Sequence, residues 1–327
     1  MSPRPRPENP ADRPGARDDR DRRDDRDRRD DRDRPDDGEG PDGRITVAVI
    51  TRDRPAAILR TVEALTALPE RPPVIVVDNS SDDTTLEALR HRGPAVRVLK
   101  PARNTGALGR NLAVRRADTP YVAFSDDDSW WTRGALRQAA DLLDRHPRLG
   151  LLAARTLVGP ERTEDPFNAV LAASPLPHEP DLPGRPVLGF LACACVVRRD
   201  AYLRAGGYHP LLFFGGEETL LAYDLAADGW GVTYEPSLTA RHHPASGGRD
   251  GRNHLLRRNE VLTFWLRRPL PTALRATARL TAAAATGEPG ARRALRETAV
   301  RLPAALAGRR PLPPHVEAAI RLLEHAR

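Results

Sequence analysis

From Arg44 onward, short apolar runs alternate with amphipathic segments, and this alternation restricts the fold more than any other feature. Strand-like runs occupy 45–50, 73–77, 96–99, 121–124 and 149–153. Helix-like periodicity covers 55–68, 82–91, 106–117 and 132–145. The pattern predicts an α/β fold with a mostly parallel sheet and helices on both faces. Such sheets bind ligands at the carboxyl ends of their strands, so the residues after each run are the first candidates for a site.

The first 43 residues differ in character from the rest. Residues 18–35 repeat the hexad Asp-Asp-Arg-Asp-Arg-Arg almost three times and contain nothing that could join a core. Residues 1–43 hold 12 Arg against 15 acidic residues, so the two signs nearly cancel. We therefore expect a disordered, charged N-terminal tail at 1–43. A nucleic-acid or partner-binding arm is disfavoured, because the net charge of the tail is slightly negative.

Positive charge is concentrated at the other end of the chain, whose overall formal net charge is +7. Residues 267–327 contain 12 Arg against 4 Glu. Helical patterns recur there at 274–285, 291–306 and 315–326. This predicts a basic, Ala- and Arg-rich helical extension. Its charge suits peripheral contact with anionic lipid, and a helical cap over an acceptor cleft is an equally good interpretation.

Other features limit the class of protein and its location. No apolar stretch reaches the roughly 18 residues of a membrane span, and the N-terminus is charged, which predicts a cytoplasmic protein. Cys193 and Cys195 are too close together for an ordinary disulfide and are interpreted as buried apolar side chains. Only 5% of the residues are aromatic and the arginines are scattered, so we expect no nucleic-acid partner.

Polar residues follow the first two predicted strands. Thr51 and Asp53 come after the first, and Asp78 ends the second. A carboxylate at a strand end can accept hydrogen bonds from a ribose or a base. Residues 79–83 are typical of a helix cap, which accounts for them but not for Asp78. These three residues are therefore candidate contacts to a nucleotide.

A glycine-containing helix start follows the third strand. Asn104, Gly106 and Arg110 belong to the segment NTGALGRN. Its G-x-x-G spacing and its position do not match the G-x-G-x-x-G fingerprint of dinucleotide-binding enzymes. Backbone N–H groups at such a helix start, together with Arg110, could meet a phosphate. Close packing of the helix on the sheet is the alternative explanation for the glycines.

The triplet Asp126-Asp127-Asp128 after the fourth strand is the strongest single signal. Three adjacent carboxylates repel one another, and a cation would remove that cost. If the segment is extended, Asp126 and Asp128 share a face while Asp127 points elsewhere. Hard oxygen ligands suit Mg²⁺ or Mn²⁺, which commonly bridge to substrate phosphates. An acidic surface turn is the alternative, which the flanking Phe124 and Trp130-Trp131 disfavour.

A pair of carboxylates follows two phenylalanines and two glycines. Glu217 and Glu218 come directly after Phe213-Phe214-Gly215-Gly216 and lead into a helical pattern at 219–228. The apolar neighbours could desolvate a carboxylate and raise its pKa, as a general base requires. The alternative is that the helix N-terminus alone favours acidic residues there.

Two basic segments come later. His242 and His243 follow a strand-like run at 231–234 and a short loop, and one of them could supply a further metal ligand. Residues 257–260, Arg-Arg-Asn-Glu, begin another helix in this interpretation. They could hold phosphate charge, and a solvated helix face is nearly as good an explanation.

Taken in order, these segments resemble family 2 of the nucleotide-sugar glycosyltransferases, whose catalytic domain has the GT-A fold. The resemblance covers roughly 44–266. It depends on four stretches: ITVAVITRDRP, VIVVDNSSDD, NTGALGRNLAVRRADTPYVAFSDDDSWW and GGEETLLAYDLAADGW. It implies three segments, a charged tail at 1–43, a GT-A domain at 44–266 and the helical extension at 267–327.

The resemblance also implies roles for individual residues. Asp78 would contact the nucleoside, Asp126 the ribose or metal region, and Asp128 the divalent ion at the diphosphate. Glu218 would be the base that deprotonates the acceptor hydroxyl, because it is the second member of a pair resembling the family's Glu-Asp motif. His242 is favoured over His243 as the metal-side histidine.

The sequence departs from the family pattern near the base. Members often have an Asp two residues after the base and an Arg four residues beyond that, where this chain has Leu220 and Asp224. The base is Glu218 rather than the usual Asp, which adds one methylene to its reach.

Together these features imply an inverting, metal-dependent transferase. It would use a nucleotide-sugar donor and a glycan, lipid-linked or small-molecule acceptor, in the cytoplasm or at the inner face of the membrane, in cell-envelope glycan or glycolipid synthesis. A domain that binds nucleotide sugar without turnover is the first alternative, and a nucleic-acid-binding protein is the second.

Overall fold

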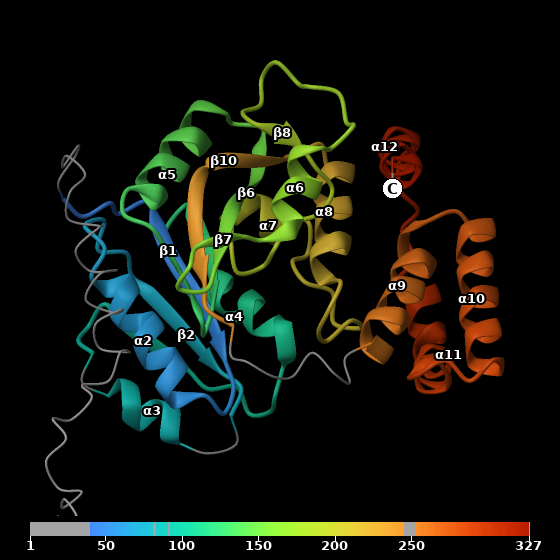
Figure 1. Cartoon of the computed structure of the whole chain (residues 1–327), viewed down its shortest axis with the longest axis horizontal. Coiled ribbons are helices and arrows are strands. Elements are labelled where there is room, and N and C mark those ends of the chain that lie inside the picture. The colour runs from blue at the N-terminus through green and yellow to red at the C-terminus, as the bar shows by residue number, and fades with distance from the viewer. Residues whose placement is uncertain (1–39, 81–82, 91, 245–252, 327) are drawn as a thin grey trace, which may run out of the picture. The chain divides into compact units, whose positions relative to one another are not determined.

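The computed structural model describes residues 40–80, 83–90, 92–244 and 253–326 (Figure 1). Most of the predicted tail, 1–39, lies outside the described residues, and so do residues 81–82 of the predicted helix cap. The end of the tail region packs on the rest of the chain. The backbone N–H of Asp42 donates to the Glu70 carbonyl at 2.8 Å, and the Asp42 carboxylate accepts hydrogen bonds from Arg44.

Four parallel strands form one half of the sheet. In spatial order they are β3 (Val96–Leu99), β2 (Val74–Asp78), β1 (Ile45–Thr51) and β4 (Tyr121–Asp126). All residues of β1 are buried. Ile45, Val47 and Val49 belong to the core on one face of the sheet, whereas Ala48 and Ile50 belong to the core on the other. Apart from Thr46 and Thr51 this run is apolar, because a central parallel strand is covered on both faces.

The second half of the sheet is mixed. β9 (Cys195–Arg198) lies antiparallel between β4 and β6 (Leu149–Val158). Beyond β6 come β10 (Gly231–His242), which is parallel to it, and β5 (Ser129–Trp131), which is antiparallel to β10. β7 (Thr163–Glu164) and β8 (Arg185–Pro186) are short additions. The α/β class is confirmed, and the antiparallel β9 comes from the cysteine-containing run that sequence analysis treated only as buried.

The helices cover both faces of this sheet (Figure 1). On the face of Ile45 pack α2 (Pro55–Thr66) and α5 (Ala135–Arg145). On the opposite face pack α4 (Gly109–Arg116), α7 (Arg199–Arg204) and α8 (Glu217–Ala227). The remaining helices are α3 (Thr84–Leu89), the 3-10 turn η1 (Gly106–Leu108), α6 (Pro166–Ala172), α9 (Asn253–Arg267), α10 (Leu270–Ala285), α11 (Ala291–Ala307) and α12 (Pro314–His325).

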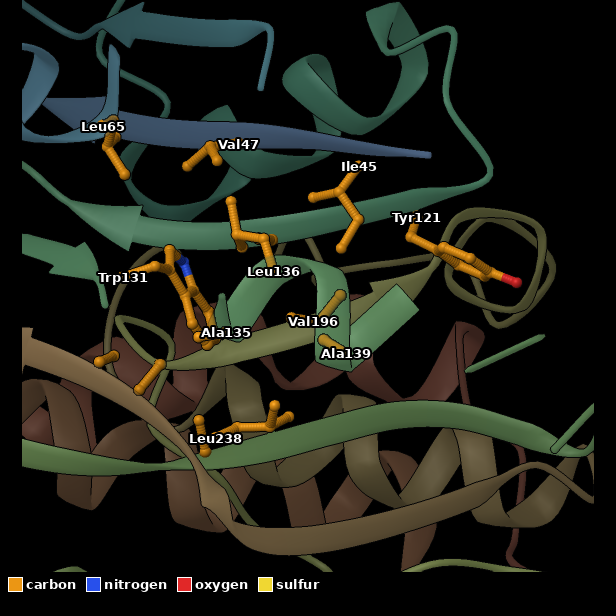
Figure 2. Packing of buried hydrophobic residues seen from close by; sticks show 14 of the residues in the cluster. Ile45, Val47, Leu65, Tyr121, Trp131, Ala135, Leu136, Ala139, Val196 and Leu238 are labelled. Atoms are coloured by element: carbon orange, nitrogen blue, oxygen red, sulfur yellow. The ribbon is translucent and has the colours of Figure 1, made fainter. Parts of the chain in front are cut away.

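Figure 2 shows how one face of the core is filled. Ile45 and Val47 from β1 and Val196 from β9 face Leu136 of α5. The indole of Trp131, only 1% exposed, packs into the same cluster. Each fully buried Leu, Ile or Val contributes about 1.5–3 kcal/mol to the free energy of folding. The prediction that Cys193 and Cys195 are buried and unbridged is confirmed.

Buried arginine ion pairs join the C-terminal helices to each other and to α8. Arg267 at the end of α9 donates to both carboxylate oxygens of Asp224 on α8, and both side chains are less than 10% exposed. Arg268 pairs with Glu317 and Glu324 on α12. Part of the C-terminal positive charge is therefore neutralised inside the protein. Within the described residues, no helix is long and apolar enough to cross a membrane.

Two expected element boundaries were wrong. β10 extends to His242, so this histidine ends a strand rather than following a loop. Residues 257–260 lie inside α9, which begins at Asn253, and Arg258 and Asn259 are buried instead of forming a solvated face. In both cases tertiary pairing extends the element beyond the local pattern.

Replacing Arg267 with Met should lower the free energy of unfolding by about 3 kcal/mol or more, because it leaves the buried Asp224 carboxylate unpaired. Arg204→Met is the matched control, since Arg204 pairs with Asp200 at an exposed position. Urea denaturation measures both variants. Equal stability losses in the two would contradict a structural role for the buried pair.

Candidate active site

The carboxyl ends of β1, β2 and β4 meet at one edge of the sheet. Thr51 is in register with Asp78 on β2, and its neighbour Ile50 is in register with Asp126 on β4. Residues that are far apart in the sequence are thus brought to adjacent strand ends, where ligands bind in α/β sheets.

Asp78 is fully buried, and its two carboxylate oxygens differ. Oδ1 accepts the backbone N–H of Ser80 at 2.9 Å, whereas Oδ2 has no hydrogen-bond partner within the described residues. An unsatisfied buried acceptor costs about 1–3 kcal/mol, which a donor from a ligand would offset. Asp53 lies in the adjoining loop. Its backbone N–H donates to Ser80 Oγ at 2.8 Å, and its side chain is 51% exposed.

The acidic triplet does not continue the strand. β4 ends at Asp126, and Asp127 and Asp128 form a turn before β5. The expectation that Asp126 and Asp128 share one face of an extended segment is therefore wrong. Asp127 and Asp128 both bond to the guanidinium of Arg54, while Asp126 pairs with Arg110.

Arg54 is a site residue that sequence analysis did not single out. Its Nη2 lies 2.9 Å from Asp128 Oδ2, and it also bonds to Asp127. Asp127 accepts a further hydrogen bond from Thr51 Oγ1 at 2.8 Å. Burial raises the pKa of Asp127 to about 6, although Arg54 and Thr51 act in the opposite direction. Thr51 and Asp127 thus bond to each other and support the turn.

The two histidines have different partners. His242 Nε2 lies 3.4 Å from Asp128 Oδ1. The ring of His243 instead stacks on Trp130, with centroids 4.6 Å apart, and its backbone N–H donates to the Asp128 carbonyl. Burial lowers the pKa of His242, but the hydrogen bond with Asp128 and the charges of Asp128 and Asp126 together outweigh burial, so the pKa is raised. His242 therefore faces a carboxylate of the triplet.

Arg110 lies at the centre of the charged groups. Its side chain is 2% exposed, pairs with Asp126 and sits 5.6 Å from the centroid of the Phe124 ring. Although burial lowers the pKa of the guanidinium, the charge of Asp126 and then of Glu217 and Glu218 raises it. The guanidinium of Arg110 therefore interacts electrostatically with both Asp126 and the glutamate pair. Its charge is buried and does not face solvent.

Gly106 fixes the position of the loop before the glutamates. Its φ is +58°, and a Cβ added there would lie 2.3 Å from the Phe213 carbonyl oxygen. The next residue, Ala107, donates its backbone N–H to that same carbonyl at 2.8 Å. Asn104 Oδ1 accepts the N–H of Gly106 at 2.8 Å. Asn104 and Gly106 thus shape the loop contact, and this satisfies part of the backbone that was expected to face a phosphate.

Asn259 on α9 holds the same loop from the other side. Its amide nitrogen donates to the carbonyls of Leu212 at 2.9 Å and Phe214 at 3.0 Å, and also to that of Gly215. Arg258 Nη2 adds a bond of 2.7 Å to the Leu212 carbonyl. These contacts join residues more than 40 positions apart in the sequence, so no local pattern could predict them.

Glu217 and Glu218 begin α8 directly after this loop. Glu217 is 3% exposed, whereas Glu218 is half-buried. Burial, and then the charge of Glu217, raises the pKa of Glu218 above its ordinary value. Burial likewise raises the pKa of Glu217. A half-buried carboxylate with a raised pKa can accept a proton from a bound hydroxyl near neutral pH.

The chain resembles known proteins in sequence and in fold. The model of the family described as Glycosyl transferase family 2 matches residues 46–205, which hold β1, β2, the triplet and β9. The chain therefore contains a glycosyl transferase family 2 domain. It is therefore a glycosyltransferase that uses a nucleotide-sugar donor, and the GT-A fold expected from the resemblance is confirmed.

Individual relatives of this family 2 chain are distant. It is 29% identical over 279 residues to an N-acetylglucosaminyl-diphospho-decaprenol L-rhamnosyltransferase of Mycobacterium tuberculosis, covering 71% of this chain and 89% of the relative. The mannosyltransferase PcManGT from Pyrobaculum calidifontis, solved with GDP-Man and Mn²⁺, is 22% identical with a TM-score of 0.51 over 91% of each chain. GalNAc-T7, solved with UDP, GalNAc and Mn²⁺, is 14% identical with a TM-score of 0.54 over 71% of this chain, which spans about half (48%) of that structure.

The residues of the family 2 site fit a cation held partly by substrate. Within the described residues, no group of three or more His, Cys, Asp or Glu side chains is placed to hold a metal. Asp128 and His242 do face each other, whereas Asp126 is turned to Arg110. Mg²⁺ and related ions commonly take one or two carboxylates and complete their shell with water and phosphate oxygens. The Asp128–His242 pair fits that mode and not an all-protein cage.

Changing Asn259 to Asp should impair sugar transfer about tenfold or more, because a carboxylate would replace the amide donor against three carbonyls and shift the loop before Glu218. The donor KM should change little, since Asn259 is remote from the strand ends. Gln138→Glu makes the same amide-to-carboxylate change at an exposed hydrogen bond and is the control. Steady-state kinetics with unaltered kcat for Asn259→Asp would contradict the assignment.

Proposed function

We propose that this enzyme transfers the sugar with inversion in a single displacement, with Glu218 as the general base. The observation that carries the proposal is the shared guanidinium of Arg110, which pairs with Asp126 and carries its charge close to Glu217 and Glu218. The acidic turn at the sheet edge and the glutamates of α8 therefore belong to one site. Burial raises the pKa of Glu218, and the negative charge of the neighbouring Glu217 raises it further.

In the proposed reaction one bond forms as another breaks, and one proton is transferred. The acceptor oxygen bonds to the anomeric carbon while the bond from that carbon to the donor diphosphate breaks, and the nucleoside diphosphate leaves. The acceptor proton passes to Glu218. Attack from the face opposite the leaving group inverts the configuration of the sugar. Burial of the pair and the raised pKa of Glu218 suit it to take this proton near neutral pH.

Donor contacts would come from the strand ends and the first turn of α4. The unpartnered Asp78 Oδ2 would accept a hydrogen bond from the nucleoside. Asp126 would share its carboxylate between Arg110 and the ribose or metal region. The exposed Asp53 side chain lies next to these groups and would contact the nucleotide. Thr51, Asn104, Gly106 and Arg110 would act mainly by holding the turn and the loops in place.

Asp128 and His242 would hold a divalent ion, Mn²⁺ or Mg²⁺, at the donor diphosphate. Such an ion neutralises negative charge on a leaving diphosphate. The support is the 3.4 Å approach of the two side chains and the Mn²⁺ found with two proteins of the same fold. His243 is not proposed as a ligand, because its ring stacks on Trp130.

The acceptor is proposed to be lipid-linked. The rhamnosyltransferase relative, by its name, acts on a sugar carried by a diphospho-decaprenol. An acceptor of this kind would place the enzyme at the cytoplasmic face of the membrane, in cell-envelope glycan or glycolipid synthesis. The basic segment 267–327 would then make peripheral contact with anionic lipid, and it is proposed as an extension of the GT-A domain at 44–266.

Replacing Asp128 with Asn should lower metal-stimulated transfer roughly a hundredfold or more, because metal stabilisation of a leaving group is worth several kcal/mol. The assay follows nucleoside diphosphate release from donor with EDTA, Mg²⁺ or Mn²⁺. Asp118→Asn, at an exposed position, is the control. Turnover by Asp128→Asn with an unchanged metal response would remove the metal role of Asp128.

Glu218→Gln should lower the rate of sugar transfer by about 10²- to 10⁴-fold. The same change should make the protein more stable at neutral pH. The folded protein keeps the Glu218 proton above pH 4.5, where the unfolded chain has lost it, so wild-type stability falls as pH rises toward the raised pKa. Because glutamine does not ionise, the Glu218→Gln variant does not lose stability in this way. Denaturation at several pH values and the wild-type pH–rate profile test this, with the exposed Glu161→Gln as control. Wild-type transfer that does not rise with pH would speak against Glu218 as base.

A further inference from the structure

A cavity of about 860 Å³ lies between α8 and the C-terminal helices. Its walls come from α6, α8, α9, α10 and α12. Gly216 and Thr219 line it, and these residues flank the Glu217–Glu218 pair in the sequence. One end of the cavity therefore reaches the N-terminus of the helix that carries the proposed base. Its volume is in the range of about 300–1,000 Å³ that is typical of ligand sites.

One side of the cavity is apolar and exposed. Val170 on α6 and Leu256 on α9 line it and are 52% and 50% exposed. Phe167, Leu188 and Phe264 continue the same lining. Large apolar side chains gathered in a concave wall are a recognised sign of a binding surface. This side suits a hydrocarbon chain.

Another part of the lining carries positive charge that the protein does not neutralise. Arg275 and Arg279 lie one turn apart on α10 and line the cavity, and neither forms an ion pair with any described residue. In contrast, Arg268 and Arg321 in the same lining are paired with acidic residues of α12. Two adjacent guanidiniums are suited to bind a diphosphate.

An acidic group lies on the α9 wall. Glu260 lines the cavity one turn after Leu256, whose side chain is near Gly215. Carboxylates accept hydrogen bonds from hydroxyl groups, so Glu260 suits a sugar. The lining thus offers a hydroxyl acceptor, a pair of cations and an apolar wall in one cavity.

We propose that this cavity is the acceptor site and that it binds an amphiphile in which a diphosphate joins a sugar to an apolar chain. The sugar lies at the Gly216 end, next to the first turn of α8, which carries Glu218. Arg275 and Arg279 bind the diphosphate, and the wall containing Val170 and Leu256 binds the chain. The assignment rests on the proposed transferase function, because that function supplies the need for an acceptor next to the base.

Binding of farnesyl diphosphate to the full-length protein, measured by calorimetry, tests the site directly. EDTA is included so that metal-dependent binding of the diphosphate at the donor site does not contribute. Arg279→Glu and Arg275→Glu should each weaken binding about tenfold or more, since each loses a charge-assisted contact and gains a repulsion. Arg296→Glu, the same charge change at an exposed position of α11, should leave it unchanged. Farnesol and inorganic pyrophosphate should each bind more weakly than farnesyl diphosphate.

Three results would overturn the assignment: no binding of farnesyl diphosphate to the wild type, equal weakening by Arg296→Glu, or binding of pyrophosphate as tight as that of farnesyl diphosphate. The probe carries neither a nucleotide nor a transferable sugar. The binding result therefore remains valid if the proposed catalytic roles are wrong. If farnesyl diphosphate does not bind, nucleotide-sugar turnover can still be tested separately.

Discussion

The buried guanidinium of Arg110 is the interaction on which the site depends. It neutralises Asp126 at the end of β4 and lowers the cost of placing Glu217 and Glu218 together at the start of α8. Without a cation there, the negative charges of these three carboxylates would repel one another. Arg110 comes from α4, which precedes both groups in the sequence, and it links the sheet edge to the glutamate helix.

The glutamate helix is also held from the C-terminal side. Asn259 and Arg258 bond to the carbonyls of the loop that leads into Glu217, and Arg267 pairs with Asp224 further along α8. The C-terminal helices therefore do more than cover the domain. They fix the position of the loop and helix that carry the proposed base, and they form most of the wall of the cavity beside it.

Local patterns in the sequence predicted the first half of the fold and the family. The runs at 45–50 and 121–124 are apolar because both faces of those strands are covered, and the polar residues after them are confined to the sheet edge. The sequence could not show that β9 enters between β4 and β6, since strand order is set by long-range pairing. Arg54 and Asn259 were missed for the same reason, because their partners lie 73 and at least 44 residues away.

The stereochemistry of transfer tests the central claim most directly. Proton NMR of the product formed by the wild-type enzyme, from a donor of known anomeric configuration, reports the configuration at the transferred sugar. A single displacement with Glu218 as base predicts an inverted anomeric centre. A retained configuration would contradict the mechanism, because it would require either a double displacement or attack from the face of the leaving group.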